Sequence, residues 1–122
     1  MPTSPLTEPF TPASASAALR ELTPAVRVLR QLYRTLERRQ GAGGPDRAVD
    51  PVYFELLTRF CQVRERVERG GIRLADPGRG TLEFPALRAG RPVLLQGLLG
   101  EKQVRSWRDE DRTRPLDEGP WG

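Results

Sequence analysis

Apolar residues recur at alternating spacings of three and four in two long stretches of this chain. This spacing places their side chains on one face of a helix. A loop rich in glycine and proline separates the two stretches. We therefore predict helices over about residues 13–40 and 51–69, folded back on each other as an antiparallel hairpin. The two apolar faces consist of Leu19, Leu22, Val26, Leu29, Tyr33 and Leu36 in the first helix and Tyr53, Leu56, Phe60, Val63 and Val67 in the second.

The starts of both helices carry matching signals. Thr11 and Pro12 suit the N-cap and first position of the first helix, and Asp50 and Pro51 suit those of the second. Pro24 lies inside the first helix, where its ring removes a backbone donor and crowds the preceding turn. Because the apolar spacing keeps its phase across Pro24, we predict one helix kinked at this residue.

From residue 72 onward, apolar residues alternate with polar ones, which is the period of a β-strand. The turns DPGRG and RAGR divide this region into three strands, and a fourth follows if GEKQ is a hairpin turn. We therefore predict a three- to four-stranded antiparallel β-meander over about residues 72–108. Together with the helical hairpin, this makes an α+β fold.

The two ends of the chain lack a packing pattern. Residues 1–12 contain four prolines, and residues 110–122 are charged and end in Gly-Pro-Trp-Gly, so we predict a flexible arm and a flexible tail. A single domain over residues 13–109 lies between them. One apolar face per helix is too narrow to seal a small core. Leu32 and Leu57 flank these faces and add apolar surface that the hairpin alone leaves uncovered. We therefore expect the sheet or a second copy of the chain to cover the helices, and we favour a homodimer.

The basic residues add one candidate surface. Of the twenty basic side chains only Lys102 is a lysine, and sixteen acidic ones leave a net charge of +4. A GC-rich genome encodes such an arginine excess whatever the function. Four arginines of the first helix nevertheless share a face, which suits a nucleic acid or an acidic partner because guanidinium groups bind phosphate through two hydrogen bonds. The alternative is a solvated face that pairs with acids of the second helix. The face consists of Arg27, Arg30, Arg34 and Arg38, and the acids are Glu55, Glu65 and Glu68.

The chain contains no histidine and one cysteine, Cys61. Ser/His and Cys/His catalysis are therefore excluded, a zinc site is disfavoured, and Cys61 is expected to be a small buried apolar residue. Asp76 and Glu83 remain as carboxylates for acid/base or Mg²⁺ chemistry, but Asp76 precedes a proline in a turn, where aspartate usually caps its own backbone. We predict a protein without catalytic residues, metal or cofactor. No run of about 18 apolar residues and no secretory pattern is present, so we expect a cytoplasmic protein without a membrane partner.

Several short motifs of the chain carry a resemblance to a known family. They are Leu-Ala-Asp-Pro-Gly-Arg-Gly at residues 74–80, Phe-Pro-Ala-Leu-Arg-Ala-Gly-Arg at 84–91, Val-Leu-Leu at 93–95, Phe-Thr at 10–11 and Leu-Thr-Pro-Ala-Val-Arg at 22–27. With these motifs the chain resembles the domain of unknown function family 2203, which consists of small bacterial proteins. The resemblance covers most of residues 10–109 and implies no established activity.

The same resemblance implies a polar and aromatic cluster where the third strand continues with Cys-Trp-Arg and the fourth with Tyr-Trp-His. This chain keeps only the tryptophan, so any cysteine or imidazole ligand is lost. We expect a pocket of diverged function at Gln96, Trp107 and Arg108. The corresponding residues are Gln96, Gly97 and Leu98 in the first place and Ser106, Trp107 and Arg108 in the second.

Three classes of function follow from these observations. We favour a non-enzymatic protein-interaction or oligomerisation module that forms a homodimer through its helices or a sheet edge. The alternative is a nucleic-acid-binding accessory protein that uses the arginines of the first helix. A small hydrolase or metal-dependent enzyme using Asp76 and Glu83 ranks last.

Overall fold

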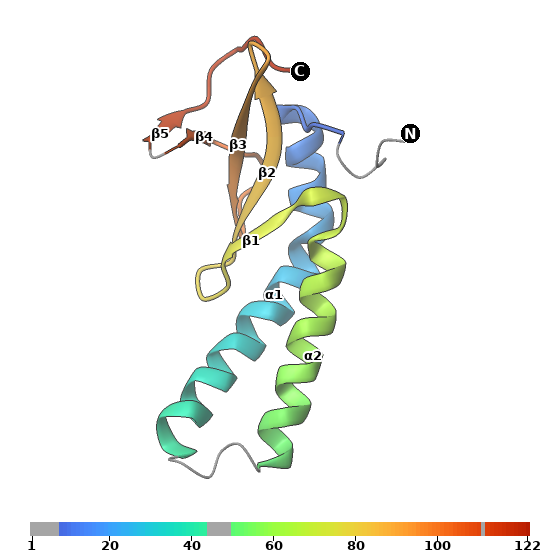
Figure 1. Ribbon diagram of the computed structural model, residues 1–122, viewed down its shortest axis with the longest axis vertical. Coiled ribbons are helices and arrows are strands. Elements are labelled where there is room, and N and C mark those ends of the chain that lie inside the picture. Colours follow the sequence, from blue (N-terminus) through green and yellow to red (C-terminus); the bar gives the residue numbers. More distant parts are fainter. Residues whose placement is uncertain (1–7, 44–49, 111) are drawn as a thin grey trace.

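The structure, a computed structural model, describes residues 8–43, 50–110 and 112–122. A sheet lies at one end of the molecule, and a helical hairpin packs on it and extends well beyond it (Figure 1). The predicted α+β fold is confirmed. Its elements are α1 (Pro12–Gly43), α2 (Pro51–Val67), the short 3₁₀ helix η3 (Arg69–Gly71) and the strands β1 (Arg73–Asp76), β2 (Thr81–Arg88), β3 (Arg91–Leu98), β4 (Ser106–Asp109) and β5 (Arg112–Pro115).

The sheet is an antiparallel meander in which the five strands lie in chain order. The strand count exceeds the predicted three to four because β5 lies in the segment that we predicted as a flexible tail. All four residues of β5 are exposed, so the strand has no alternating apolar pattern by which the sequence could reveal it. Its place is set by pairing with β4, in which Arg114 lies opposite Trp107.

Both helices begin where the sequence predicts. The backbone N–H of Ser14 donates to Thr11 Oγ1 at 3.2 Å, and the N–H of Thr11 donates to Ser14 Oγ at 2.9 Å, so the two residues cap each other at the start of α1. Asp50 Oδ1 accepts a hydrogen bond from the N–H of Val52 at the start of α2. The helix α1 continues through Pro24 and curves along its length (Figure 1).

The core lies where the apolar faces of the helices meet each other and one face of the sheet. Most of the predicted helical face is buried, and the rest packs against the core as partly buried residues. Leu32 is buried, but Leu57 is 36% exposed, so α1 and the sheet leave part of α2 uncovered. The prediction that Cys61 is buried was wrong, because this residue lies one position beyond Phe60, on the flank of the apolar face.

Both ends of the described chain pack on β2. Phe10 forms a bridge with Ala86, and its ring meets Phe84 edge-on at 5.3 Å between centroids. At the other end, Trp121 forms an antiparallel bridge with Arg88. Residues 1–7 of the predicted arm lie outside the described residues. In the described ranges, no helix is long and apolar enough to cross a membrane.

Candidate functional site

Three of the four arginines predicted on the first helix line one hollow. Arg27, Arg30 and Arg34 follow each other at spacings of three and four, which brings them to one side of α1. The opposite wall of this hollow is the loop between β3 and β4. We call this space, with a volume of about 330 Å³, the arginine hollow; it is lined by Arg27, Arg30, Gln31, Arg34, Leu99 and Gly100.

Among the described residues, the arginines of the hollow have no carboxylate partner. None of Arg27, Arg30 and Arg34 forms an ion pair with another described residue. The Nε atom of Arg30 is enclosed by protein and lacks a hydrogen-bond acceptor within the described part of the chain. Arg38 lies outside the hollow and donates to Thr35 Oγ1 at 3.3 Å. The site is therefore a local excess of positive charge.

The acids of α2 do not neutralise this face. Glu68 lies 3.8 Å from Arg64 and accepts the N–H of Leu74 at 2.8 Å. Glu55 and Glu65 form no ion pair in the ranges that the structure describes. The ion pair between the two helices instead joins Arg39 of α1 to Asp50, the N-cap of α2. In the described part of the hairpin, these three acids therefore do not pair with the arginine face.

The predicted pocket at Gln96, Trp107 and Arg108 is divided between the two faces of the sheet. Neighbouring residues of a strand point to opposite faces, so Trp107 lies opposite to Arg108. Trp107 pairs with Leu95 on the side of the helices, whereas Arg108 and Gln96 lie on the other side, the open face of the sheet. These residues therefore do not line a common pocket.

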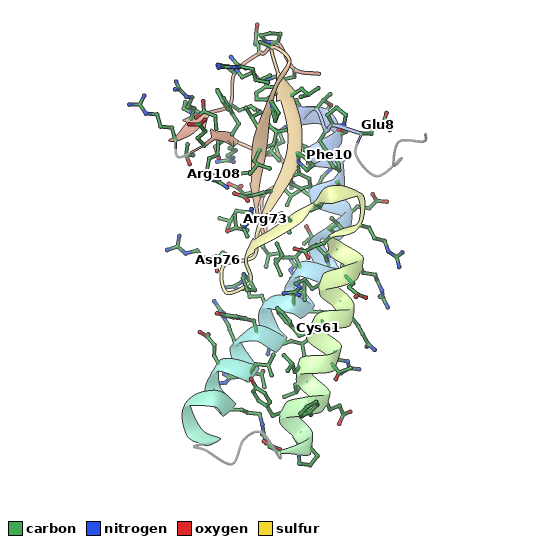
Figure 2. The ribbon with its side chains drawn as sticks, in the orientation of Figure 1. Glu8, Phe10, Cys61, Arg73, Asp76 and Arg108 are labelled. Atoms are coloured by element: carbon green, nitrogen blue, oxygen red, sulfur yellow. The ribbon has the colours of Figure 1, made fainter. Side chains whose placement is uncertain are left out.

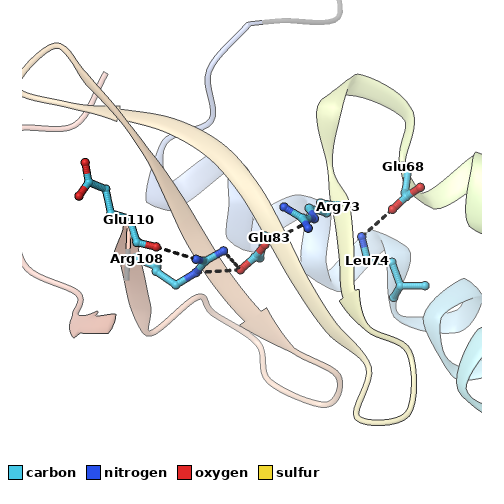
Figure 3. Close-up of polar contacts among 6 residues, drawn as sticks. All are labelled: Glu68, Arg73, Leu74, Glu83, Arg108 and Glu110. Carbon is cyan, nitrogen blue, oxygen red and sulfur yellow. Dashed lines mark hydrogen bonds and ion pairs between the residues drawn. The ribbon is translucent and has the colours of Figure 1, made fainter. Parts of the chain in front are cut away.

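On the open face, Glu83 is the centre of a polar network (Figure 3). Its side chain is only 4% exposed although it alternates with the core residues Leu82 and Phe84. Arg108 donates to Glu83 Oε2 from Nη2 at 2.8 Å and from Nε at 3.2 Å, and Arg73 Nε lies 4.0 Å from Oε1. Because Arg108 already binds the carboxylate, Glu83 serves as a structural ion-pair partner.

Gln96 and Ser106 form a second polar pair beside this network on the open face. Gln96 lies opposite both Glu83 and Ser106 in the register of the strands. Ser106 Oγ donates to Gln96 Oε1 at 3.1 Å. The positions where the family resemblance implies Cys, Tyr and His are thus Gln96, Ser106 and Arg108, and all three share the open face. Two of these side chains, Gln96 and Ser106, bind each other, and Arg108 binds Glu83 beside them, contacts that sequence periodicity did not reveal.

On the side of the helices, Trp107 packs under the end of the chain. The guanidinium carbon of Arg88 lies 4.9 Å from the ring centre of Trp107 and 5.0 Å from that of Trp121. Arg88 also binds both carboxylate oxygens of Asp117, at 2.6 and 2.8 Å. A second hollow of about 500 Å³ borders Trp107 and Arg91. The stacking of Trp121 was not predicted from the sequence, in which its signal is a tryptophan within a charged tail.

The carboxylates considered for catalysis do not form a site. Asp76 Oδ1 accepts the N–H groups of Gly78 and Arg79 at 3.1 and 3.2 Å, so it caps its own turn as predicted. Figure 2 labels Asp76 at the end of β1, where the turn to β2 begins. Within the described ranges, no group of three or more Cys, Asp or Glu residues is arranged to hold a metal ion.

Comparison with known proteins agrees with the resemblance of the meander. The family described as "Uncharacterized conserved protein (DUF2203)" matches residues 9–114. The chain belongs to this family. The DUF2203 match includes both helices, the first four strands and the start of β5, and so contains the arginine hollow and the Glu83 network. No curated protein and no solved structure matches the chain.

Proposed function

We propose that this protein is a non-enzymatic interaction module that forms a homodimer through α2. The observation that supports the proposal is an apolar stripe on this helix, made by Phe54, Leu57 and Cys61. The three residues are separated by three and four positions and therefore share one helix face. Phe54 is 59% exposed, Leu57 is 36% exposed and Cys61 is exposed. The stripe borders the buried face of α2, so the apolar surface of this helix is wider than α1 covers.

The charges on either side of the stripe favour a second copy of the chain as the partner. Asp50 and Arg64 lie seven residues before and after Leu57, so all three residues share one side of α2. When two α2 helices pair antiparallel with Leu57 on a two-fold axis, Arg64 of each copy lies opposite Asp50 of the other. The helix dipoles then also run in opposite directions. The surface is complementary to itself, as an interface between identical patches requires.

Arg64 and Asp50 each have an ion-pair partner within the chain, but both side chains remain exposed enough to contact a second copy. Arg64 lies 3.8 Å from Glu68, and its side chain is 49% exposed. Asp50 binds Arg39 with a side-chain exposure of 27%. In the dimer the four residues extend into one network of alternating charge across the interface. Such a network sets the antiparallel orientation, while the apolar stripe supplies most of the affinity.

The mass of the protein in solution tests the proposal. At micromolar concentration we expect twice the chain mass of 13.7 kDa by light scattering after gel filtration. Phe54→Glu and Leu57→Glu each shift the protein to monomer, because a carboxylate at the contact loses its water. Val28→Glu is the matched control, since Val28 is 46% exposed but lies on α1, outside the stripe.

The single thiol supplies a second readout. Cys61 lies in the stripe, so its alkylation rate falls as the protein concentration rises through the dimer dissociation constant. In Leu57→Glu the rate stays constant over the same range. A wild-type protein that remains monomeric at micromolar concentration contradicts the proposal. Loss of the dimer in Val28→Glu would place the interface elsewhere.

A further inference from the structure

We propose that the arginine hollow is a binding site for a phosphate group. The hollow is formed by α1 and the β3–β4 loop, so the site does not depend on the α2 stripe or on the dimer. Arg27, Arg30 and Arg34 supply its charge, and Gln31 adds a neutral amide at the same wall. The chemical class of the ligand follows from this set of donors.

The hollow brings like charges together, and no described carboxylate compensates them. Each of the three arginines carries a full positive charge at neutral pH, and none has an ion-pair partner among the described residues. The enclosed Nε–H of Arg30 has no acceptor there either. A bound anion lowers the cost of this repulsion, because its negative charge neutralises the charge of the three arginines.

A phosphate group fits these donors better than a carboxylate does. The two oxygens of a carboxylate lie in one plane and carry about four acceptor sites, so their hydrogen bonds are confined to that plane. The oxygens of a phosphate point in tetrahedral directions, so several guanidinium groups can bind it at once. A volume of about 330 Å³ also leaves room for part of the molecule that carries the phosphate. The ligand is therefore a phosphate ester or diphosphate, either in a free nucleotide or in a nucleic acid.

The wall opposite the arginines is held in place before a ligand arrives. The loop over residues 99–105 is tied to α1 at two points. Arg20 Nη1 donates to the carbonyl of Lys102 at 2.8 Å, and the N–H of Val104 donates to Ser16 Oγ at 3.1 Å. A fixed wall lowers the entropy that binding costs, which favours a specific site over a loose cationic surface.

Titration calorimetry with pyrophosphate and with adenosine triphosphate tests the site at low ionic strength. Wild-type protein binds both probes, and Arg30→Gln weakens binding about tenfold or more, because it removes a charge-assisted fork. Arg30→Lys keeps the charge but loses the fork, so its affinity lies between these two. Arg34→Gln is a second variant at an exposed position, which makes the result independent of any effect of Arg30 on folding.

Arg66→Gln on α2 is the matched control. Arg66 is exposed and forms no ion pair with a described residue, so this variant removes the same charge outside the hollow. Its affinity for pyrophosphate stays within twofold of wild type. The proposal is overturned if wild-type protein binds neither probe, or if Arg66→Gln weakens binding as much as Arg30→Gln does.

Substitution of Arg38 distinguishes a nucleic acid from a free nucleotide as the ligand. A nucleic acid extends beyond the hollow along α1, so Arg38→Gln weakens binding of a mixed-sequence oligonucleotide and lowers its salt dependence, while pyrophosphate binding is unchanged. If the ligand is a free nucleotide, Arg38→Gln changes neither the affinity for the oligonucleotide nor that for pyrophosphate. The oligonucleotide then binds no more tightly than pyrophosphate does. Fluorescence anisotropy of a labelled oligonucleotide measures its affinity for wild-type protein and for Arg38→Gln. Both outcomes depend on the same hollow and differ only in the molecule that carries the phosphate.

Discussion

Gly97 of β3 lies directly under Leu19 of α1. A Cβ atom at Gly97 would come within 3.0 Å of Leu19 Cδ2 and within 3.3 Å of Cε2 of Phe84. The missing side chain therefore sets how closely α1 approaches the sheet. Because the β3–β4 loop continues directly from this strand, the same contact positions α1 against the loop that forms the far wall of the arginine hollow.

Gly97→Ala is expected to destabilise the protein by about 1–3 kcal/mol, because the added methyl group overpacks the contact between helix and sheet. Urea unfolding followed by circular dichroism measures this change. In a Leu19→Ala background the same substitution costs less, since the space above residue 97 is then open. An equal cost in both backgrounds would show that the close approach is not the cause.

Arg108→Ala is expected to cost about 3 kcal/mol or more, because it leaves the buried carboxylate of Glu83 without its main partner. Glu83→Gln costs less, since an amide oxygen still accepts a hydrogen bond and Arg108 is 29% exposed to water. Arg105→Ala is the control: Arg105 is 78% exposed and lies 3.7 Å from Glu101, so we expect a change below about 0.5 kcal/mol. Denaturant unfolding of the three variants checks the order.

The stability of the hairpin is expected to fall in acid through Asp50. The hydrogen bond from Arg39 holds the pKa of Asp50 below its ordinary value, and the N–H of Val52 acts in the same direction. A lowered pKa in the folded state means that the carboxylate stabilises the fold above the unfolded pKa of about 3.9 and loses this effect as the pH falls further.

Asp50→Asn therefore lowers Tm at neutral pH, and its difference from wild type narrows to zero as the pH falls below about 4. Thermal unfolding across this range is the measurement. Arg39→Gln removes the leading cause of the pKa shift. The difference in Tm between this variant and wild type should therefore also narrow as the pH falls. A difference that persists unchanged in acid would assign the effect to helix capping alone.

A cysteine at position 57 is expected to form a disulfide between two copies. In a Cys61→Ser background, Leu57→Cys places one thiol on each side of the two-fold axis, where antiparallel helices bring the side chains together. Val28→Cys in the same background is the control and should remain monomeric on mild oxidation. Non-reducing gel electrophoresis separates the two results. A cross-link that forms equally in both variants would mean random collision.

Trp121→Ala is expected to shift the fluorescence of Trp107 to longer wavelength and to lower stability by about 1–2 kcal/mol. The two rings meet at 5.8 Å between centroids, with Arg88 stacked on both. Removing Trp121 exposes this stack to water and leaves Trp107 as the sole tryptophan, so its emission can be measured directly. Unchanged emission would mean that the end of the chain does not cover Trp107 in solution.

Sequence periodicity predicted the scaffold but only part of the sites. The spacing of Arg27, Arg30 and Arg34 was sufficient to place them on one side of α1, because helical geometry depends only on local spacing. The hollow itself also needs Leu99 and Gly100, which are far away in the chain. The sequence could not show this contact, since a turn pattern contains no information on what packs against it.

What the sequence by itself determined is the set of local elements: two helices with caps at Thr11 and Asp50, an antiparallel meander, and the absence of histidine chemistry. Only the tertiary structure decided that β5 exists, that Trp121 packs on Trp107, and that Cys61 is exposed. The physical reason is that apolar periodicity reports burial against neighbouring elements. A polar edge strand, the contact between two tryptophans and the exposure of a helix flank depend instead on which distant parts of the chain pack together.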